Sequence, residues 1–282
     1  MRGERGPVPV QTDVLLRRNG GRELKLNGAR VERVDRLRSE LATLVFTPDR
    51  LAVVKGGPAV RRAYFDRALG RLLPAQAGLP ASYGEALGQR NAALRRVSLG
   101  FSSREALAPW TQRVAELGLE LAVSRRRVLE LLQPGFAERA GELGLADVSL
   151  AYRGEPATQE ALEARIDRDL ERGSTGLGPH LDEIAVSAGE RDLRSFGSQG
   201  EQRLAVLSLL LAEADLIDAT RQIPPLLLLD DVLSELDPGR REILAARVGG
   251  RGQTVITTTS RAALPAEPAQ VVEVRPGEAK AA

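Results

Sequence analysis

The strongest constraint on the fold is a β-α-β pattern in the last third of the chain. Residues 226–229 are all leucine and lie between Pro224-Pro225 and Asp230-Asp231, which is typical of a strand buried on both faces of a parallel sheet. Asp237-Pro238 is a good helix start, and Gly249-Gly250 is a good helix end. The β-branched residues 255–259 predict the next strand. The two strands should therefore be parallel, with a right-handed crossover.

Two adjacent carboxylates, Asp230 and Asp231, follow the first of these strands. Open α/β sheets bind ligands at the carboxyl ends of their strands. An acid pair there suits a phosphate–Mg²⁺ site, in which one carboxylate holds the metal and the other orients an attacking water. Taken alone, the pattern fits a solvated strand end equally well.

Ser198 and Glu201 have the spacing of a capping box and precede a long apolar run, residues 204–217. One interpretation is only that a helix begins here. The functional interpretation adds that free backbone N–H groups and the helix dipole face an anion, with Gly200 permitting close approach.

Three motifs occur in a fixed order: Ser198-Gln199-Gly200-Glu201, the apolar strand with Asp230-Asp231, and Ser234-Glu235-Leu236-Asp237. This set resembles the signature motif, Walker B motif and D-loop of ABC-type ATPase heads. The resemblance implies that ATP and Mg²⁺ are the cofactors. It further implies that Asp230 binds Mg²⁺ and that Asp231 stands in the place of the catalytic Glu. The residues implied to bind ATP are Ser198, Gln199, Gly200, Glu201 and Asp237. Of these, Ser198 and Gly200 are implied to touch the nucleotide across a dimer.

Composition excludes several classes of site. The 282 residues include no Cys and one His, His180, so disulfides, thiolate metal sites and multi-His metal sites are excluded. No apolar run approaches the ~20 residues that span a bilayer, and residues 1–6 lack the apolar stretch of a signal peptide; we expect a cytoplasmic protein without membrane contact. Because the net charge is only +2, a nucleic-acid surface would have to be a local patch.

The remainder of the chain shows local signals. Asn19-Gly20 between residues 8–16 and 23–31 predicts a β-hairpin. Residues 59–172 are mostly of helical pattern, with capping boxes expected at Ser82 and Ser102. The arginine runs 95–96 and 125–127 fit a solvated helix face better than a DNA contact. His180 fits a satisfied structural histidine, and residues 184–187 with Leu193 indicate strands.

A second resemblance covers residues 41–259. It is carried by Val45-Phe46-Thr47-Pro48, Lys55-Gly56-Gly57-Pro58, Arg61-Arg62-x-x-Phe65-Asp66, Gln89-Arg90-Asn91-Ala92-Ala93-Leu94 and Gly176-x-Gly178-Pro179-His180-x-Asp182-Glu183. These motifs resemble the RecF family, although Leu181 stands where that family usually has Arg. The implied fold class is α/β: an ABC-type head whose mixed β lobe has parallel core strands, with a helical lobe beside it. The expected division is 1–58 and 173–275 for the ATPase lobe, 59–172 for the helical lobe, and 276–282 for a disordered tail.

The resemblance implies an ATP-dependent DNA-binding protein of replication and recombinational repair. The expected partners are duplex DNA with single-strand gaps, recombination mediator proteins such as RecR, and, for a complete chain, a second copy bound through ATP. The expected roles are recombinase loading at gaps and SOS induction, with slow ATP hydrolysis.

No Gly-x-x-x-x-Gly-Lys-Ser/Thr occurs in the 282 residues, so the phosphate-binding loop of such heads is missing. We expect a truncated or mis-started family member that does not bind ATP by itself, and ATPase activity is left open. One alternative is a nucleotide-free interaction module that pairs with a complete head. Another is an SMC-type head, against which the absence of sustained heptads argues.

Overall fold

The centre of the molecule is a three-stranded parallel sheet. The structure is a computed structural model that describes residues 2–5, 8–17, 21–31, 42–250 and 252–281. The sheet order is β10-β9-β5, with β5 (Thr43–Phe46), β9 (Leu226–Asp230) and β10 (Thr254–Thr257). Phe46 lies opposite Leu229, and Thr257 lies opposite Asp230. The predicted parallel pair is confirmed, and the carboxyl ends of all three strands meet at one edge.

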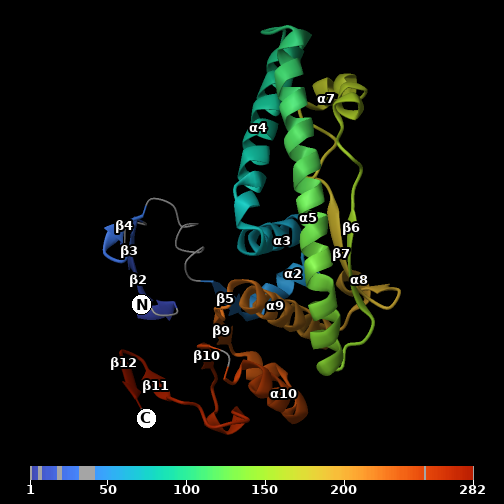
Figure 1. The fold of residues 1–282 in the computed structure, drawn as a ribbon. Helices are drawn as coiled ribbons and strands as arrows, with labels where there is room; N and C mark the ends of the chain where they lie inside the picture. Colours follow the sequence, from blue (N-terminus) through green and yellow to red (C-terminus); the bar gives the residue numbers. More distant parts are fainter. Residues whose placement is uncertain (1, 6–7, 18–20, 32–41, 251, 282) are drawn as a thin grey trace.

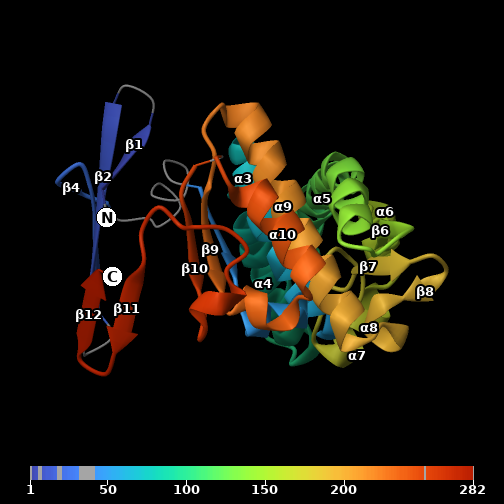
Figure 2. The ribbon, with the colours of Figure 1, turned by 90° about the horizontal axis from the view of Figure 1, so that it is seen from below.

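Two helices next to these strands in the chain lie on one side of the sheet (Figures 1 and 2). α9 (Gln199–Arg221) precedes β9, and α10 (Pro238–Val248) joins β9 to β10. The apolar run of α9 is buried on several sides, with Leu209 and Ile217 fully inaccessible. Burial of a side chain of this size contributes about 1.5–3 kcal/mol, so packing fixes α9 against the sheet and the helices behind it.

A body of helices lies next to α9 (Figure 1). α4 and α5 form a long antiparallel pair, and α7 contacts α4 at its far end. α5 has 35 residues and is therefore about 52 Å long. The helices of this body are η1 (Pro48–Leu51), α2 (Ala52–Lys55), α3 (Pro58–Leu72), η2 (Pro74–Gln76), α4 (Leu79–Ser98), η3 (Arg104–Leu107), α5 (Ala108–Glu142), α6 (Gln159–Glu163) and α7 (Ile166–Arg172).

An antiparallel sheet borders this helical body. It consists of β6 (Val148–Arg153), β7 (Glu183–Ala188) and β8 (Arg191–Asp192). The prediction that 59–172 is helical is therefore incomplete, because β6 lies inside it. Gln133 of α5 explains how β6 is held: its side chain donates to the carbonyl of Val148 at 2.9 Å and accepts from the amide of Leu150 at 2.7 Å. A side chain of the helix thus provides hydrogen-bond partners for two backbone groups of β6.

The arginines of the sequence motifs serve as structural anchors. Arg61 is buried and donates to the carbonyls of Val54 and Gly56, each at 2.9 Å, and to Oε1 of Glu183 at 2.8 Å. It therefore ties α3 to the segment before it and to the start of β7. Arg62 donates to the carbonyl of Asp182 at 2.8 Å.

Arg125 corrects the prediction of a solvated arginine run. Its side chain is 4% exposed and forms a two-pronged pair with Asp66 at 2.7 and 2.9 Å. It also donates to the carbonyl of Pro179 at 2.6 Å. The helical repeat turns Arg125 inward while its neighbour Arg127 stays exposed.

His180 is a satisfied structural histidine, as predicted. Its Nδ1 lies 2.7 Å from the hydroxyl of Tyr83, and its Nε2 lies 3.1 Å from the carbonyl oxygen of Thr175. Because a carbonyl only accepts, Nε2 carries the proton and Nδ1 accepts from Tyr83. Burial is the main cause that lowers the pKa of His180, so the ring is neutral in the folded protein near pH 7.

Two small antiparallel sheets lie on the side of the parallel sheet away from α9 (Figures 1 and 2). One contains β1 (Arg2–Arg5), β2 (Val8–Leu16), β3 (Arg22–Leu26) and β4 (Ala29–Arg30). Its β2–β3 pairing confirms the predicted hairpin, although the Asn19-Gly20 turn lies outside the described residues. The other pairs β11 (Val272–Arg275) with β12 (Glu278–Ala281).

The β11–β12 hairpin includes residues 276–281, which belong to the tail that the sequence predicted to be disordered. Pro276 and Gly277 form its two-residue turn, with Gly277 at φ 80°. A proline followed by a positive-φ glycine is the residue pair of a type II turn. The expected division of the chain into lobes otherwise stays a prediction.

Three other local predictions are wrong. Ser82 lies inside α4, which begins at Leu79, and the helical turn after Ser102 has Ser103 as its N-cap residue. Leu193 starts a short helix, α8 (Leu193–Phe196), in place of a strand. Asp192 caps α8 by accepting from the amides of Arg194 and Ser195 at 2.9 and 3.2 Å. This local cap favours a helical turn over an extended strand at Leu193.

Candidate functional site

The first candidate group is the turn at the start of α9, residues 198–202, which we call the signature turn. Its capping box is formed in both directions. Ser198 Oγ accepts from the amide of Glu201 at 3.2 Å, and Glu201 Oε2 accepts from the amide of Ser198 at 2.8 Å. Arg191 of β8 donates to Glu201 Oε1 at 2.8 Å. The backbone N–H of Ser198 and then Arg191 hold the pKa of Glu201 below its ordinary value, so the box is intact at neutral pH.

The capping box leaves two amides free. Gln199 and Gly200 occupy the first turn of α9, where no backbone acceptor lies within the helix, and no acceptor for them is present in the part of the chain that the structure describes. Gly200 is exposed, and a Cβ placed on it would meet only Ser198 Oγ, at 3.9 Å. Free N–H groups at the positive end of a 23-residue helix suit an anion such as a phosphate.

Gln202 fixes the orientation of this turn and was missed as a site residue. It is 4% exposed, and its Nε2 donates to the carbonyl of Leu193 at 2.8 Å and to that of Gly197 at 3.3 Å. These two hydrogen bonds therefore fix the junction between α8 and α9 from the buried side. A Cβ at Gly197 would lie 2.5 Å from the carbonyl oxygen of Leu193, so only glycine fits there.

The second candidate group is the acid pair at the end of β9. Asp230 is exposed, and its Oδ1 accepts from the hydroxyl of Thr257 at 2.6 Å. The amide of Asp231 donates to the same hydroxyl oxygen at 3.0 Å. Asp231 has φ 50° and ψ 27°, a left-handed conformation that is uncommon for residues other than glycine. Sequence reasoning missed Thr257, whose signal was its place at the end of the neighbouring strand.

The segment after the acid pair is held by its own contacts. It forms η4 (Val232–Glu235), and the hydroxyl of Ser234 donates to the carbonyl of Asp231 at 2.9 Å. Asp237 caps α10 by accepting from the amide of Arg240 at 2.9 Å, as the sequence predicted. Arg241 donates to the carbonyl of Leu233 at 2.9 Å, which attaches the segment to α10.

The acid pair fits a Mg²⁺ ion that also binds phosphate. Oδ2 of Asp230 and the carboxylate of Asp231 have no hydrogen-bond or ion-pair partner among the described residues. No group of three or more His, Cys, Asp or Glu side chains that could hold a metal was found in that part of the chain. One or two carboxylates, completed by water and phosphate oxygens, is the usual coordination of protein-bound Mg²⁺.

The two groups do not contact each other within one chain. No hydrogen bond or ion pair between described residues joins 198–202 to Asp230, Asp231 or Asp237. α9 leads into β9 at the opposite edge of the sheet, and at about 1.5 Å per residue for 23 helical residues it is about twice as long as the strand. α9 also contacts η1 and α2, the two helical segments that follow β5.

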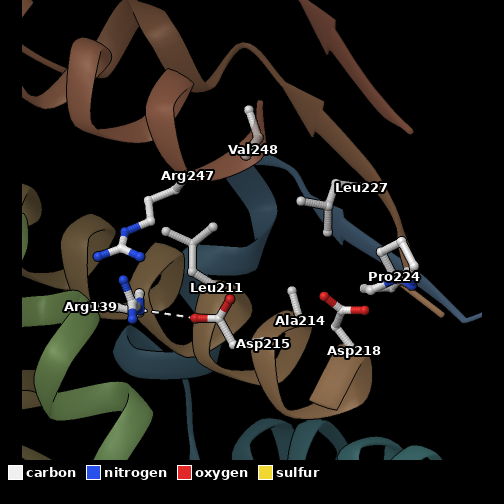
Figure 3. A pocket seen from close by; sticks show the side chains of 10 residues that line it. Arg139, Leu211, Ala214, Asp215, Asp218, Pro224, Leu227, Arg247 and Val248 are labelled. Atoms are coloured by element: carbon white, nitrogen blue, oxygen red, sulfur yellow. Dashed lines mark ion pairs between the residues drawn. The ribbon is translucent and has the colours of Figure 1, made fainter. Parts of the chain in front are cut away.

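A separate pocket lies at the other edge of the sheet (Figure 3). Its lining comes from α5, the second half of α9, the start of β9 and the end of α10. Arg139 and Asp215 form an ion pair in its lining, with Arg139 Nε 3.0 Å from Asp215 Oδ2 (Figure 3). None of the predicted site residues lines this pocket.

The sequence is similar to those of known proteins over most of its length. No protein-family model matches the chain. The DNA replication and repair protein RecF of Anaeromyxobacter dehalogenans is 37% identical over 277 residues, which cover 91% of this chain and 73% of that protein. RecF of Geobacter sulfurreducens is 35% identical over 280 residues, covering 92% and 74%.

Solved structures show the fold. A structure of the recombination mediator protein RecF with ATP, in the RecFOR pathway, superposes with a TM-score of 0.85 at 24% identity, covering 98% of this chain and 76% of that one. An Smc head domain from Pyrococcus furiosus gives a TM-score of 0.51 at 19% identity, covering 99% and 72%. The fold is thus that of ABC-type ATPase heads, and the likeness to the Smc head is weaker. None of the described helices has both the length and the apolar character needed to cross a membrane. On the similarity of its sequence over most of its length, the chain belongs to the RecF family of DNA replication and repair proteins.

Proposed function

We propose that this chain acts in recombinational DNA repair as one head of an ATP-dependent, DNA-binding pair of ABC-type heads. The support is its family, its fold, and a relative whose solved structure is described as RecF with ATP in the RecFOR pathway. In this proposal the pair binds duplex DNA near single-strand gaps and helps mediator proteins such as RecR to load recombinase, with SOS induction as the downstream result.

The signature turn supplies the contacts to nucleotide in this proposal. The free amides of Gln199 and Gly200, with the hydroxyl of Ser198, face the terminal phosphate of an ATP that the opposite head holds. Glu201 acts by keeping the turn in shape through the Ser198 amide. Asp237 lies on the same interface, at the start of α10.

In this proposal the acid pair forms the metal-binding part of a nucleotide site. Asp230 would hold Mg²⁺, which when bound neutralises phosphate charge, and Asp231 would orient the attacking water. Asp is one methylene shorter than Glu, which suits slow hydrolysis. Because the 282 residues contain no phosphate-binding loop motif, the nucleotide at the signature turn has to be held by a partner head that carries one.

One observation carries the proposal: the signature turn presents two free amides at an open glycine, yet no hydrogen bond or ion pair between described residues joins it to the acid pair of its own chain. Groups of this kind are complementary to opposite sides of one triphosphate. They meet only when two heads face each other.

The test replaces Gly200 by Ala and mixes the chain with a complete RecF relative, with and without Mg²⁺–ATP. The added methyl has room in this fold but stands where a phosphate would approach. Light scattering after gel filtration should show ATP-dependent heterodimers for the unchanged chain and at least about tenfold weaker association for Gly200→Ala, the loss of about 1.4 kcal/mol.

Gly88→Ala is the matched control, because Gly88 is an exposed helical glycine of α4 with open space around its Cβ position. It should associate like the unchanged chain. Heterodimers that form equally well without ATP, or that tolerate Gly200→Ala, would contradict the proposal. Without a partner, the chain should not bind ATP. A micromolar affinity for ATP in a titration would show that the chain can hold the nucleotide although it contains no phosphate-binding loop motif.

A further inference from the structure

Among the residues that the structure describes, Thr257 is the one whose side chain hydrogen-bonds both members of the acid pair. It ends β10, directly opposite Asp230 in the parallel register. Its hydroxyl donates to Asp230 Oδ1 at 2.6 Å and accepts from the amide of Asp231 at 3.0 Å. A hydroxyl can do both at once because it has one donor and two acceptor positions. A serine keeps this chemistry, whereas a valine of similar shape loses it.

The bond to the carboxylate determines which oxygen faces outward. With Oδ1 engaged by Thr257, the rotation of the Asp230 carboxylate is restricted, and Oδ2 is left without a partner among the described residues. Restricting a metal-ligating carboxylate by a neighbouring hydrogen bond is a common way to orient a ligand. Here the orienting group comes from a different strand, so its position is set by sheet pairing.

The bond to the amide holds the turn at Asp231. A non-glycine residue at φ 50° is unfavourable and persists only when surrounding contacts hold it. Both ends of this residue are held, its N–H by Thr257 and its C=O by Ser234 at 2.9 Å. The Thr257 hydroxyl thereby fixes where the chain leaves the strand and where the second carboxylate stands.

A contribution to folding alone does not explain this arrangement. The three groups lie at an exposed strand end, where water competes for every hydrogen bond and the net gain in stability is small. What the hydroxyl does provide is a fixed geometry for two adjacent carboxylates.

We infer that Thr257 is a positioning residue of the acid pair: it orients the Asp230 carboxylate toward a hydrated, phosphate-bound divalent cation and holds Asp231 beside it. The inference rests on the metal role of the acid pair in the proposed function.

The test measures Mn²⁺ binding to the chain alone by paramagnetic broadening of backbone amide NMR signals. In the unchanged chain, Mn²⁺ should broaden the amides of Asp230, Asp231 and Thr257 first. Thr257→Val should weaken the Mn²⁺ affinity by about 10- to 100-fold, the usual effect of removing a group that orients a metal ligand. Thr257→Ser should restore the affinity to within about twofold, because serine keeps both hydrogen bonds.

Thr254→Val is the control, since it makes the same change at the other end of β10 and should leave Mn²⁺ binding unaltered. Hydrogen exchange of the Asp231 amide gives a second readout: exchange should accelerate in Thr257→Val and stay slow in Thr257→Ser. If the unchanged chain binds Mn²⁺ at the acid pair but Thr257→Val binds it equally well, the inference fails while the proposed function stands. If Asp230→Asn leaves Mn²⁺ binding intact, or no Mn²⁺ binds there, the metal role in the proposed function fails and the inference fails with it.

Discussion

The side-chain amide of Gln202 donates a 2.8 Å hydrogen bond to the carbonyl oxygen of Leu193, nine residues earlier in the chain. Both groups are buried. The contact joins the first turn of α9 to the first residue of α8, so the free amides of the signature turn point in a direction that a core side chain sets.

Replacing Gln202 by Leu should therefore destabilise the protein although it adds an apolar side chain to the interior. The carbonyl of Leu193 would be left buried without a donor, which costs about 1–3 kcal/mol. Urea unfolding followed by circular dichroism measures this. Gln199→Leu, at an exposed position of the same turn, should change the free energy of unfolding by less than about 0.5 kcal/mol. If both substitutions changed the free energy of unfolding equally, Gln202 would not be the residue that holds α9 to α8.

Two ion pairs tie α7 to the α4–α5 region, and they should differ greatly in strength. Arg90 and Asp169 are fully buried at 2.7 Å, whereas Arg104 and Asp167 are 59% and 76% exposed at the same distance. Arg90→Met leaves the Asp169 carboxylate buried without its partner and should cost about 3–5 kcal/mol.

Arg104→Met should cost at most about 1 kcal/mol, since water screens the exposed pair. Thermal unfolding of both variants measures the two losses of stability and shows whether the buried pair contributes more than the exposed one. A small loss for Arg90→Met would show that the amide of Gly176, which donates to Asp169 Oδ1 at 3.0 Å, is sufficient to hold the buried carboxylate.

Stability should fall as the pH is lowered through the range in which histidine titrates. The folded-state pKa of His180 is depressed, first by burial, so below its ordinary pKa of about 6.5 the unfolded chain takes up a proton that the folded chain does not. The free energy of unfolding should be constant from pH 8 to about 7 and then decline toward pH 5.5.

His180 is the single histidine of the chain, so His180→Gln should remove most of this decline. Urea midpoints at closely spaced pH values measure the slope. An unchanged slope in the variant would mean that carboxylates cause the decline.

α5 and α9 cross closely at Gly135. A Cβ at this position would lie 3.2 Å from the Cβ of Ala212. Gly135→Val should therefore overpack the crossing and cost about 1–3 kcal/mol. Gly141→Val places the same side chain in the same helix with nothing within 4 Å of its Cβ and should be tolerated. Chemical unfolding of the two variants provides the comparison, and similar stabilities would indicate that the helices separate at little cost.

The features that the sequence predicted correctly have local causes. The leucine run with its flanking prolines and acids, the Ser198–Glu201 spacing and the cap at Asp237 each encode a structure within a few residues. The parallel pairing of β9 and β10 followed from the length and content of the connection between them.

The features that it did not predict depend on partners far along the chain. Arg125 resembles its exposed neighbours until Asp66, 59 residues away, is placed beside it. Thr257 and Asp230 are 27 residues apart and meet only through sheet register. β6 was hidden in a helical region because its stability comes from β7 and from Gln133 of α5.

The length of α5 has a mechanical consequence. The helix is continuous over 35 residues, begins beside α4 far from the sheet (Figure 1), and crosses α9 at Gly135, directly after its internal Pro134. Turning a rod about 52 Å long by one degree about one end displaces the other end by roughly 1 Å. A tilt of α5 at its crossing with α9 is thus largest at the distant tip, and a probe attached near Phe101, in the turn between α4 and α5, would move farther than one placed at the strands.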